Sequence, residues 1–372
     1  MIEPKEPSMT FSFETVMPSA RSHGLDLEDS SSRSRGFPRW SILVLLVLGG
    51  CVSGPSGNVP DAPVPAAPRP TVDVRRPTEA QAMRADEGRT LINDGAPEEA
   101  IVVFESLLDE NPSLTVAYIG IGTAYDSMGD AIRAEPAFAR ATRLEPRNFD
   151  AQFGHGEALR ALGRFRAALR AYQQALVVEP DAADALGALA ATFLELDLAR
   201  SAIAPAERMV ELRPGDGAAL VNLGTAYMLA GRPSDAIDTY EIAIEMVGND
   251  PELIGNLIEC YAIEERFQES VNAGQVLLAI APSAIAWERQ GRGYFRLGDY
   301  DASVESYRRA VEIDPEYWPA LNGIGVNELN AWLSSERTEL EAREEAASAF
   351  RASLRINPDQ PKVVRLLTTY SL

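Results

Sequence analysis

Apolar and small residues recur along the chain at the spacing of two short helices. In the 34 residues from Thr115 to Asn148, the residues at helical spacing are Tyr118, Ile121, Gly122, Tyr125, Ala134, Phe138 and Ala141. Side chains three or four positions apart share one face of a helix, so the first four predict one helix and the last three a second. Gly129 and Asp130 supply the turn. The stretch is therefore predicted to be a helical hairpin that crosses closely at Gly122.

The hairpin pattern repeats with a constant period. Successive units end at Pro112, Pro146, Pro180, Pro214 and Pro282, and Gly248 stands where the missing proline would be. Neighbouring positions in this series are 34 residues apart, and Pro282 lies twice 34 residues beyond Pro214. A proline at this place ends one helix or opens the next. The regular period predicts a stack of hairpins, which is an all-α solenoid.

The order of large, Gly, Tyr, Ala, Phe, Ala and Pro positions in each unit resembles the tetratricopeptide repeat. The resemblance implies a right-handed α-solenoid of about eight helix-turn-helix repeats, closed by a C-terminal capping helix over 359–372. The repeats are expected near 81–114, 115–148, 149–182, 183–216, 217–250, 251–283, 284–317 and 318–358.

Two repeats depart from this pattern at the helix crossing. The fourth has Ala190 and Ala206 where glycine and an aromatic residue are expected. The sixth has Ile258 and Gly274 at the same two positions. Only the neighbouring repeats make the sixth assignment secure.

The eighth repeat is longer than the others. Pro315 to Pro358 spans 43 residues, nine more than the period. We expect the insertion to lie between the two helices and to extend the first helix past Trp332. Thr338 and Glu341 have the spacing of a capping box for the second helix.

The first 50 residues predict an export signal. A polar, Ser-rich extension precedes Arg33, Arg35 and Arg39, and an apolar run follows over 42–48. Basic, then apolar, then small residues are typical of a signal peptide. The run is shorter than the roughly 20 apolar residues that a membrane-spanning helix needs.

The end of this run, Leu48-Gly49-Gly50-Cys51, resembles the bacterial lipobox. The resemblance implies that Cys51 is lipidated and becomes the first residue of the mature protein; an ordinary signal peptide and an unprocessed anchor are the alternatives. Val52 differs from the Asp that retains some lipoproteins in the inner membrane, which favours the outer membrane.

Residues 51–78 predict a disordered tether between this anchor and the repeats. Prolines stand at positions 55, 60, 63, 65, 68 and 70, with Ala, Ser and Gly between them. Such a composition cannot bury a core and favours extended polyproline conformations.

Composition and charge argue against several classes of function. The chain has two His and two Cys, which leaves little material for metal sites or disulfides. Its net charge of −21 would repel nucleic acid and anionic lipid surfaces. We predict no catalytic residue, no metal, no cofactor and no small-molecule substrate. His155 and Cys260 are expected to be buried packing residues, although a disulfide or redox role for Cys260 stays open.

The concave surface of such a solenoid is lined by first-helix residues, and the resemblance implies that it is the binding groove. In repeats five to eight, the polar residues at the groove positions are Asn222, Thr225, Asn256, Glu259, Arg289, Arg292 and Asn322. Amide side chains both donate and accept hydrogen bonds, which suits an extended peptide backbone. Solvated groove side chains and pairing of Arg292 with Glu259 are the alternatives. The Lys/Asn/Arg carboxylate clamp of chaperone-binding members is absent from this pattern.

These features predict a lipid-anchored scaffold on the periplasmic face of the bacterial envelope that binds other envelope proteins. It resembles the tetratricopeptide lipoproteins that support assembly of tight-adherence (Flp) pili and secretins. A partner in outer-membrane protein insertion or cell-wall synthesis is the alternative, and an enzyme is a third hypothesis.

Overall fold

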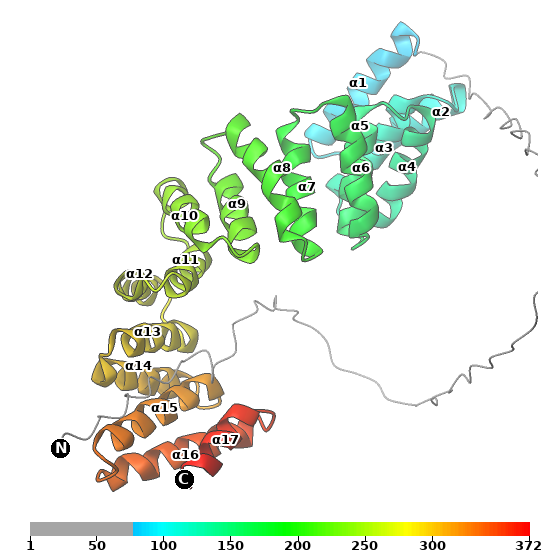
Figure 1. Ribbon diagram of the computed structural model, residues 1–372. Helices are drawn as coiled ribbons and strands as arrows, with labels where there is room; N and C mark the ends of the chain where they lie inside the picture. The colour runs from blue at the N-terminus through cyan, green and yellow to red at the C-terminus, as the bar shows by residue number, and fades with distance from the viewer. Residues whose placement is uncertain (1–76) are drawn as a thin grey trace, which may run out of the picture. The chain divides into compact units, whose positions relative to one another are not determined.

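The computed structural model describes residues 77–372, and all regular elements among them are α-helices (Figure 1). The predicted signal over 1–50, the lipidation of Cys51 and most of the tether lie outside the described residues. The first eight helices are α1 (Glu79–Asn93), α2 (Pro97–Glu110), α3 (Thr115–Ser127), α4 (Ala131–Leu144), α5 (Phe149–Ala161), α6 (Phe165–Val178), α7 (Ala183–Glu195) and α8 (Ala199–Leu212). The remaining helices are α9 (Gly217–Leu229), α10 (Pro233–Val247), α11 (Pro251–Ile263), α12 (Phe267–Ile280), α13 (Ala284–Leu297), α14 (Tyr300–Ile313), α15 (Trp318–Ser334), α16 (Leu340–Ile356) and α17 (Pro361–Thr369).

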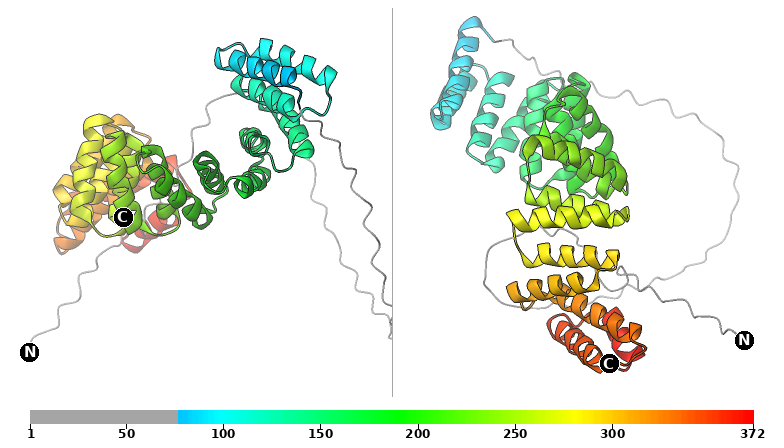
Figure 2. Two further views of the ribbon diagram at one scale, coloured as in Figure 1. Left: turned by 90° about the horizontal axis from the view of Figure 1, so that it is seen from above. Right: turned by 90° about the vertical axis from the view of Figure 1, so that its left-hand side faces the viewer.

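The helices pair as eight antiparallel hairpins, and each hairpin packs on the next, which confirms the predicted solenoid. Two further views show the helices following one another along the stack in chain order (Figure 2). The first helices α3, α5, α7, α9 and α11 begin 34 residues apart, and α13 begins one residue early. None of the described helices is long and apolar enough to cross a membrane.

In several hairpins an aromatic ring of the second helix lies between two neighbouring first helices and holds them together. The fully buried ring of Phe104 lies against Gly88 of its own hairpin and Gly120 of the next, and Phe138 likewise lies against Gly122 and Gly154. A Cβ added at Gly122 would lie 2.8 Å from the Phe138 ring, closer than real Cβ contacts come. The glycines are therefore needed for the rings to enter.

The fourth and sixth hairpins fill this place differently. Ala206 of α8 has no ring, and Met209 of the same helix packs against Gly187 instead. In the sixth hairpin the glycine is on the second helix. The fully buried Ile258 of α11 and Gln290 of α13 are the large side chains, and the Gln290 carboxamide lies against Gly274.

The C-terminal end is closed by α17, as predicted. Gln360, the residue before this helix, is buried and accepts a hydrogen bond from Asn322 of α15 at 2.7 Å. The ring of Tyr370 meets Trp332 edge-on with 6.5 Å between the centroids. The buried Val363 and the partly buried Leu366 and Leu367 of α17 pack on the same cluster, so the segment covers the last hairpin with apolar, aromatic and polar contacts.

The insertion of the eighth hairpin lengthens both of its helices to 17 residues, and α15 runs past Trp332 as expected. The predicted capping box is wrong. The residue before α16 is Glu339, with no side-chain cap, and the Thr338 hydroxyl donates to the Ser335 carbonyl at 2.7 Å. Glu336 and Arg337 adopt left-handed backbone conformations, which shift the helix start by one residue.

Candidate binding groove

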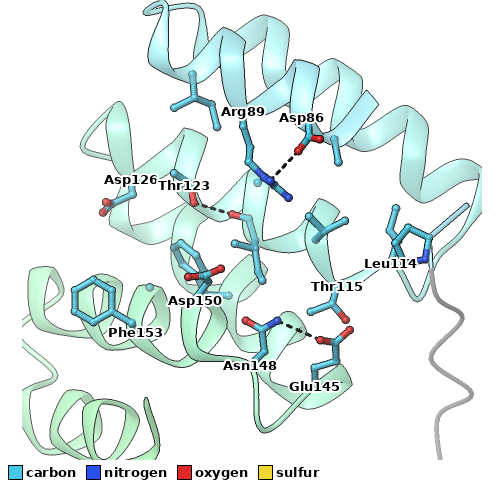
Figure 3. Close-up of a pocket in the computed structure, with 18 of the residues that line it drawn as sticks. Asp86, Arg89, Leu114, Thr115, Thr123, Asp126, Glu145, Asn148, Asp150 and Phe153 are labelled. Carbon is cyan, nitrogen blue, oxygen red and sulfur yellow. Dashed lines mark hydrogen bonds and ion pairs between the residues drawn. The ribbon is translucent and has the colours of Figure 1, made fainter. Parts of the chain in front are cut away.

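In the part of the chain that the structure describes, a cleft lies over the first helices of hairpins one to three. It encloses about 740 Å³ and is lined by side chains of α1, α3 and α5, by Phe138 of α4 and by residues of the turns before α3 and α5 (Figure 3). Its apolar lining includes Leu114, Val116, Ile119, Phe138 and Phe153. The cleft therefore offers an apolar floor that is large enough for several side chains of a ligand.

Two glycines that make room for the aromatic rings of the core also line the cleft. Gly120 is the sixth residue of α3, Gly154 is the sixth residue of α5, and both line the cleft. A larger residue at either position would meet the ring of Phe104 or Phe138 below it. The packing of the solenoid and the shape of the groove thus depend on the same glycines.

Carboxylates surround the apolar floor. The acidic lining residues are Asp86, Asp126, Glu145, Asp150 and Glu157. Arg89 is the one basic residue among those that line the cleft, and its guanidinium pairs with Asp86 at 2.8 Å. Glu145 accepts a hydrogen bond from the Asn148 amide at 3.1 Å. Asp126 and Asp150 are exposed and form no ion pair with any described residue, so they are available to a ligand.

Charge repulsion is built into this rim. Desolvation of its carboxylate by the surrounding protein raises the pKa of Asp126, and the neighbouring Glu157 carboxylate raises it further, while Arg160 lowers it. Glu157 is held in place by the Tyr172 hydroxyl at 2.6 Å and by Arg160 at 3.0 Å. A bound cation beside Asp126 would relieve the repulsion, so the cleft favours positively charged groups.

Sequence comparison identifies the repeat. Models described as "Tetratricopeptide repeat" match residues 119–165, 192–252, 221–285 and 284–317, and one described as "TPR repeat" matches 156–197. Together these matches run from 119 to 317, more than half of the chain. The chain belongs to the tetratricopeptide repeat family. Such repeats typically serve as scaffolds that bind proteins or peptides in their groove.

Solved structures match parts of the chain. Pseudomonas aeruginosa pilF shares 17% identity over 57% of this chain and 98% of its own, with a TM-score of 0.49. A tetratricopeptide repeat protein from Parabacteroides merdae shares 13% identity over 64% of this chain and 94% of its own, with a TM-score of 0.45. No curated protein matches the sequence.

The predicted groove residues of tetratricopeptide repeats five and six are half-buried and partly engaged in the fold. The Thr225 hydroxyl lies 3.1 Å from the hydroxyl of the buried Tyr240, and the Asn256 side chain lowers the pKa of the same Tyr240 hydroxyl, which burial raises. These contacts join α9, α10 and α11. Asn222 is half-buried on α9. Whether any of the three also binds a partner remains a prediction.

Glu259, Arg289 and Arg292 form one internal charge cluster. Glu259 of α11 accepts from Arg289 at 3.2 Å and from Arg292 at 2.5 Å, both on α13. Arg292 also approaches the buried Glu288 at 3.9 Å. Burial raises the pKa of Glu288, and the charge of Arg292 opposes this shift. The geometry corresponds to the alternative in which Arg292 pairs with Glu259 across neighbouring repeats.

Asn322 does not line the groove. It is fully buried on α15, and its amide donates to Gln360. The repeat pattern places it at a groove position, but the segment that leads into α17 covers that position in the last repeat. Its prediction as a groove residue was therefore wrong.

The other candidates for chemistry occupy structural positions. Cys260 is buried and free, and burial raises the pKa of its thiol to about 12, which keeps it protonated at neutral pH. His155 is half-buried rather than fully buried, and its Nε2 lies 3.5 Å from Glu135. Desolvation lowers the pKa of His155, although Glu135 opposes the shift. Within residues 77–372, no three acidic, His or Cys side chains gather as a metal site.

The cleft of the first three repeats was not predicted from the sequence, because the predicted groove residues all lie in repeats five to eight. The signal was present in Gly120 and Gly154, which leave the groove floor open, and in Asp126 and Asp150, which lie on neighbouring first helices.

Proposed function

We propose that this tetratricopeptide repeat protein is a scaffold that binds a cationic segment of a partner protein in the cleft over α1, α3 and α5. The observation that carries the proposal is an apolar floor surrounded by carboxylates of which two, Asp126 and Asp150, have no ion-pair partner among the described residues. A segment that fits would place one large apolar side chain between Lys or Arg residues. The charges would orient the segment and speed its association.

The cleft suits an extended segment better than a compact ligand. Its lining residues come from three successive first helices, so the site runs across the repeats. An apolar anchor would bury against Ile119 and Phe153. Apolar burial contributes about 25 cal/mol per Å², so one large side chain accounts for much of a moderate affinity.

We further propose that the scaffold is lipid-anchored at Cys51 on the periplasmic face of the bacterial envelope, most consistently at the outer membrane, and supports assembly of a complex such as a Flp-type pilus or secretin. This part rests on the basic, apolar and small residues that precede Cys51 and on the Pro-rich segment that follows. Radiolabelled palmitate should label the wild type and not Cys51→Ser. Equal labelling of both proteins would remove the anchor from the proposal.

The groove is tested with a fluorescein-labelled peptide Lys-Arg-Phe-Arg-Lys and the purified full chain. Asp126→Asn with Asp150→Asn should weaken binding about tenfold or more, since two close charge pairs are lost. Because both residues are exposed, the fold should be unaffected. Fluorescence anisotropy gives the affinity, and circular dichroism checks the helix content.

The matched control is Asp109→Asn with Asp238→Asn. Both residues are exposed, have no ion pair with a described residue and lie on second helices, away from the cleft. The control removes the same charge and should change the affinity less than about twofold, because distant surface charges are screened by salt. Equal weakening by the two double variants would show attraction to the net charge of the chain rather than a site.

A further inference from the structure

A basic surface interrupts the acidic chain at hairpins two and three. Between positions 131 and 178 there are eight arginines and four acidic residues, whereas positions 79–130 hold eleven acidic residues and two arginines. The excess is concentrated where α6 begins, with Arg164, Arg166 and Arg170 all exposed. This contrast marks the start of α6 as a distinct electrostatic region.

These arginines line one shallow hollow. It encloses about 460 Å³ between the start of α6 and the end of α7, and its lining residues are Gly163, Arg164, Phe165, Arg166, Ala167, Arg170 and Leu196. Phe165 and Leu196 are half-buried and give the hollow an apolar floor. None of its lining residues is shared with the cleft over α1, α3 and α5.

The arginines have little internal function. Arg164 approaches Glu135 only at 3.8 Å, and Arg166 and Arg170 form no ion pair with any described residue. Glu195 and Asp197 flank Leu196 but pair with neither of them. Arg170 lies in the second turn of α6, whereas Arg164 is its N-cap residue and Arg166 lies in its first turn, where the helix dipole favours negative charge and no acidic residue is present. The positions of Arg164 and Arg166 are thus unfavourable for the helix alone.

We propose that this hollow is a second docking surface, which binds an acidic segment of a protein that carries a large apolar side chain between Asp or Glu residues. The guanidinium group of arginine binds a carboxylate through two parallel hydrogen bonds. The apolar side chain would pack against Phe165 and Leu196. An anionic membrane fits less well, because the chain carries a net charge of −21 and the arginines surround a hollow rather than a protruding face.

Two surfaces of opposite charge would let one molecule hold two partners at once. The cleft belongs to first helices, and the hollow to the start of a second helix and two turns. The hollow is independent of the proposed groove, since its residues and its probe differ.

The test uses the purified full chain and a fluorescein-labelled peptide Glu-Asp-Phe-Asp-Glu. Arg166→Glu with Arg170→Glu should weaken binding by about tenfold or more, because two attractive pairs become repulsive. The same variant should bind the basic peptide Lys-Arg-Phe-Arg-Lys as the wild type does. Replacing the Phe of the acidic probe by Ser should also weaken binding to the wild type.

The matched control is Arg355→Glu with Arg365→Glu, two exposed arginines without ion pairs to described residues near the other end of the solenoid. The hollow would be overturned as a site if the control variant lost as much affinity for the acidic peptide. It would also be overturned if the wild type bound the peptide equally well after its Phe was replaced by Ser. The proposal would also be overturned if the wild type bound vesicles that contain anionic lipid but did not bind the acidic peptide. A wild-type dimer that the Arg166→Glu, Arg170→Glu variant no longer forms would overturn it as well. Circular dichroism confirms that each variant is folded.

Discussion

At the sixth position of their first helices, the second and third repeats have Gly120 and Gly154, whereas the fifth, sixth and seventh have Asn222, Asn256 and Arg289. In the first region the ring of the preceding second helix fills the space beneath the glycine, and the groove above stays open. In the second region side chains occupy this surface and bind each other, as Arg289 binds Glu259.

In both regions the space between the helices is filled, but different kinds of side chain fill it, so the packing does not depend on one fixed pattern of residues. Phe138 enters between two glycines in one region, whereas the buried Gln290 side chain lies against Gly274 in the other. Both arrangements satisfy the close packing of a protein interior. Only the first leaves an open, acidic groove, so the polar groove residues of the second region are better explained by packing.

The largest expected effect is the loss of a locking ring. Phe138→Ala should lower the free energy of unfolding by about 3–5 kcal/mol, because the ring is 3% exposed and joins two first helices. The control Val102→Ala removes a 65% exposed side chain and should change stability by less than about 0.5 kcal/mol. Urea unfolding measures both. Similar values for the two variants would contradict the ring as the link between repeats.

The glycine side of the same contact is tested by overpacking. Gly122→Leu should destabilise the chain by about 1–3 kcal/mol, although leucine is the better helix former, because its Cβ would press on the Phe138 ring. Glu105→Gln, an exposed change on α2, should be close to neutral. Equal melting temperatures would mean that the helices do not cross at Gly122.

The charge cluster of the second region gives a smaller, pH-dependent effect. Arg292→Ala should cost about 1–2 kcal/mol at pH 8, because Glu288 stays buried with one cation fewer. Burial already raises the pKa of Glu288, so between its unfolded and folded pKa values the folded chain keeps a proton that the unfolded chain releases. As the pH rises through this range, the Glu288 carboxyl lowers the free energy of unfolding. The deficit of Arg292→Ala should therefore shrink at pH 5. A constant deficit between pH 5 and pH 8 would show that the loss is one of packing.

The repeat architecture could be predicted from the sequence because its signals are local and periodic. Glycine, aromatic and proline positions recur every 34 residues, and each hairpin contacts mainly its neighbours, so one well-matched unit specifies the others. The extended α15 and the closing α17 also followed from the spacing. The start of α16 did not, because left-handed Glu336 and Arg337 decide it.

The candidate site was harder to predict because groove positions do not reveal what covers them. Asn322 has the spacing of a groove residue, yet Gln360, 38 positions later, buries it. Arg289 and Arg292 share a helix face as expected, but their partner Glu259 lies on another repeat. The sequence left the pairing of Arg292 with Glu259 as an alternative, because spacing alone does not decide whether polar residues of neighbouring repeats pair with each other or bind a partner.

The most direct test of the central claim places a photo-crosslinking amino acid at Thr123 of the open cleft or at Asn256 of the filled region, in cells that produce the tagged chain. Both positions lie on first helices, and Gln174 on α6 serves as a control away from the groove. We expect a protein adduct from Thr123 that Asp126→Asn with Asp150→Asn removes, and little adduct from Asn256. Adducts from Asn256 with none from Thr123 would contradict it and place the binding site in the fifth to seventh repeats.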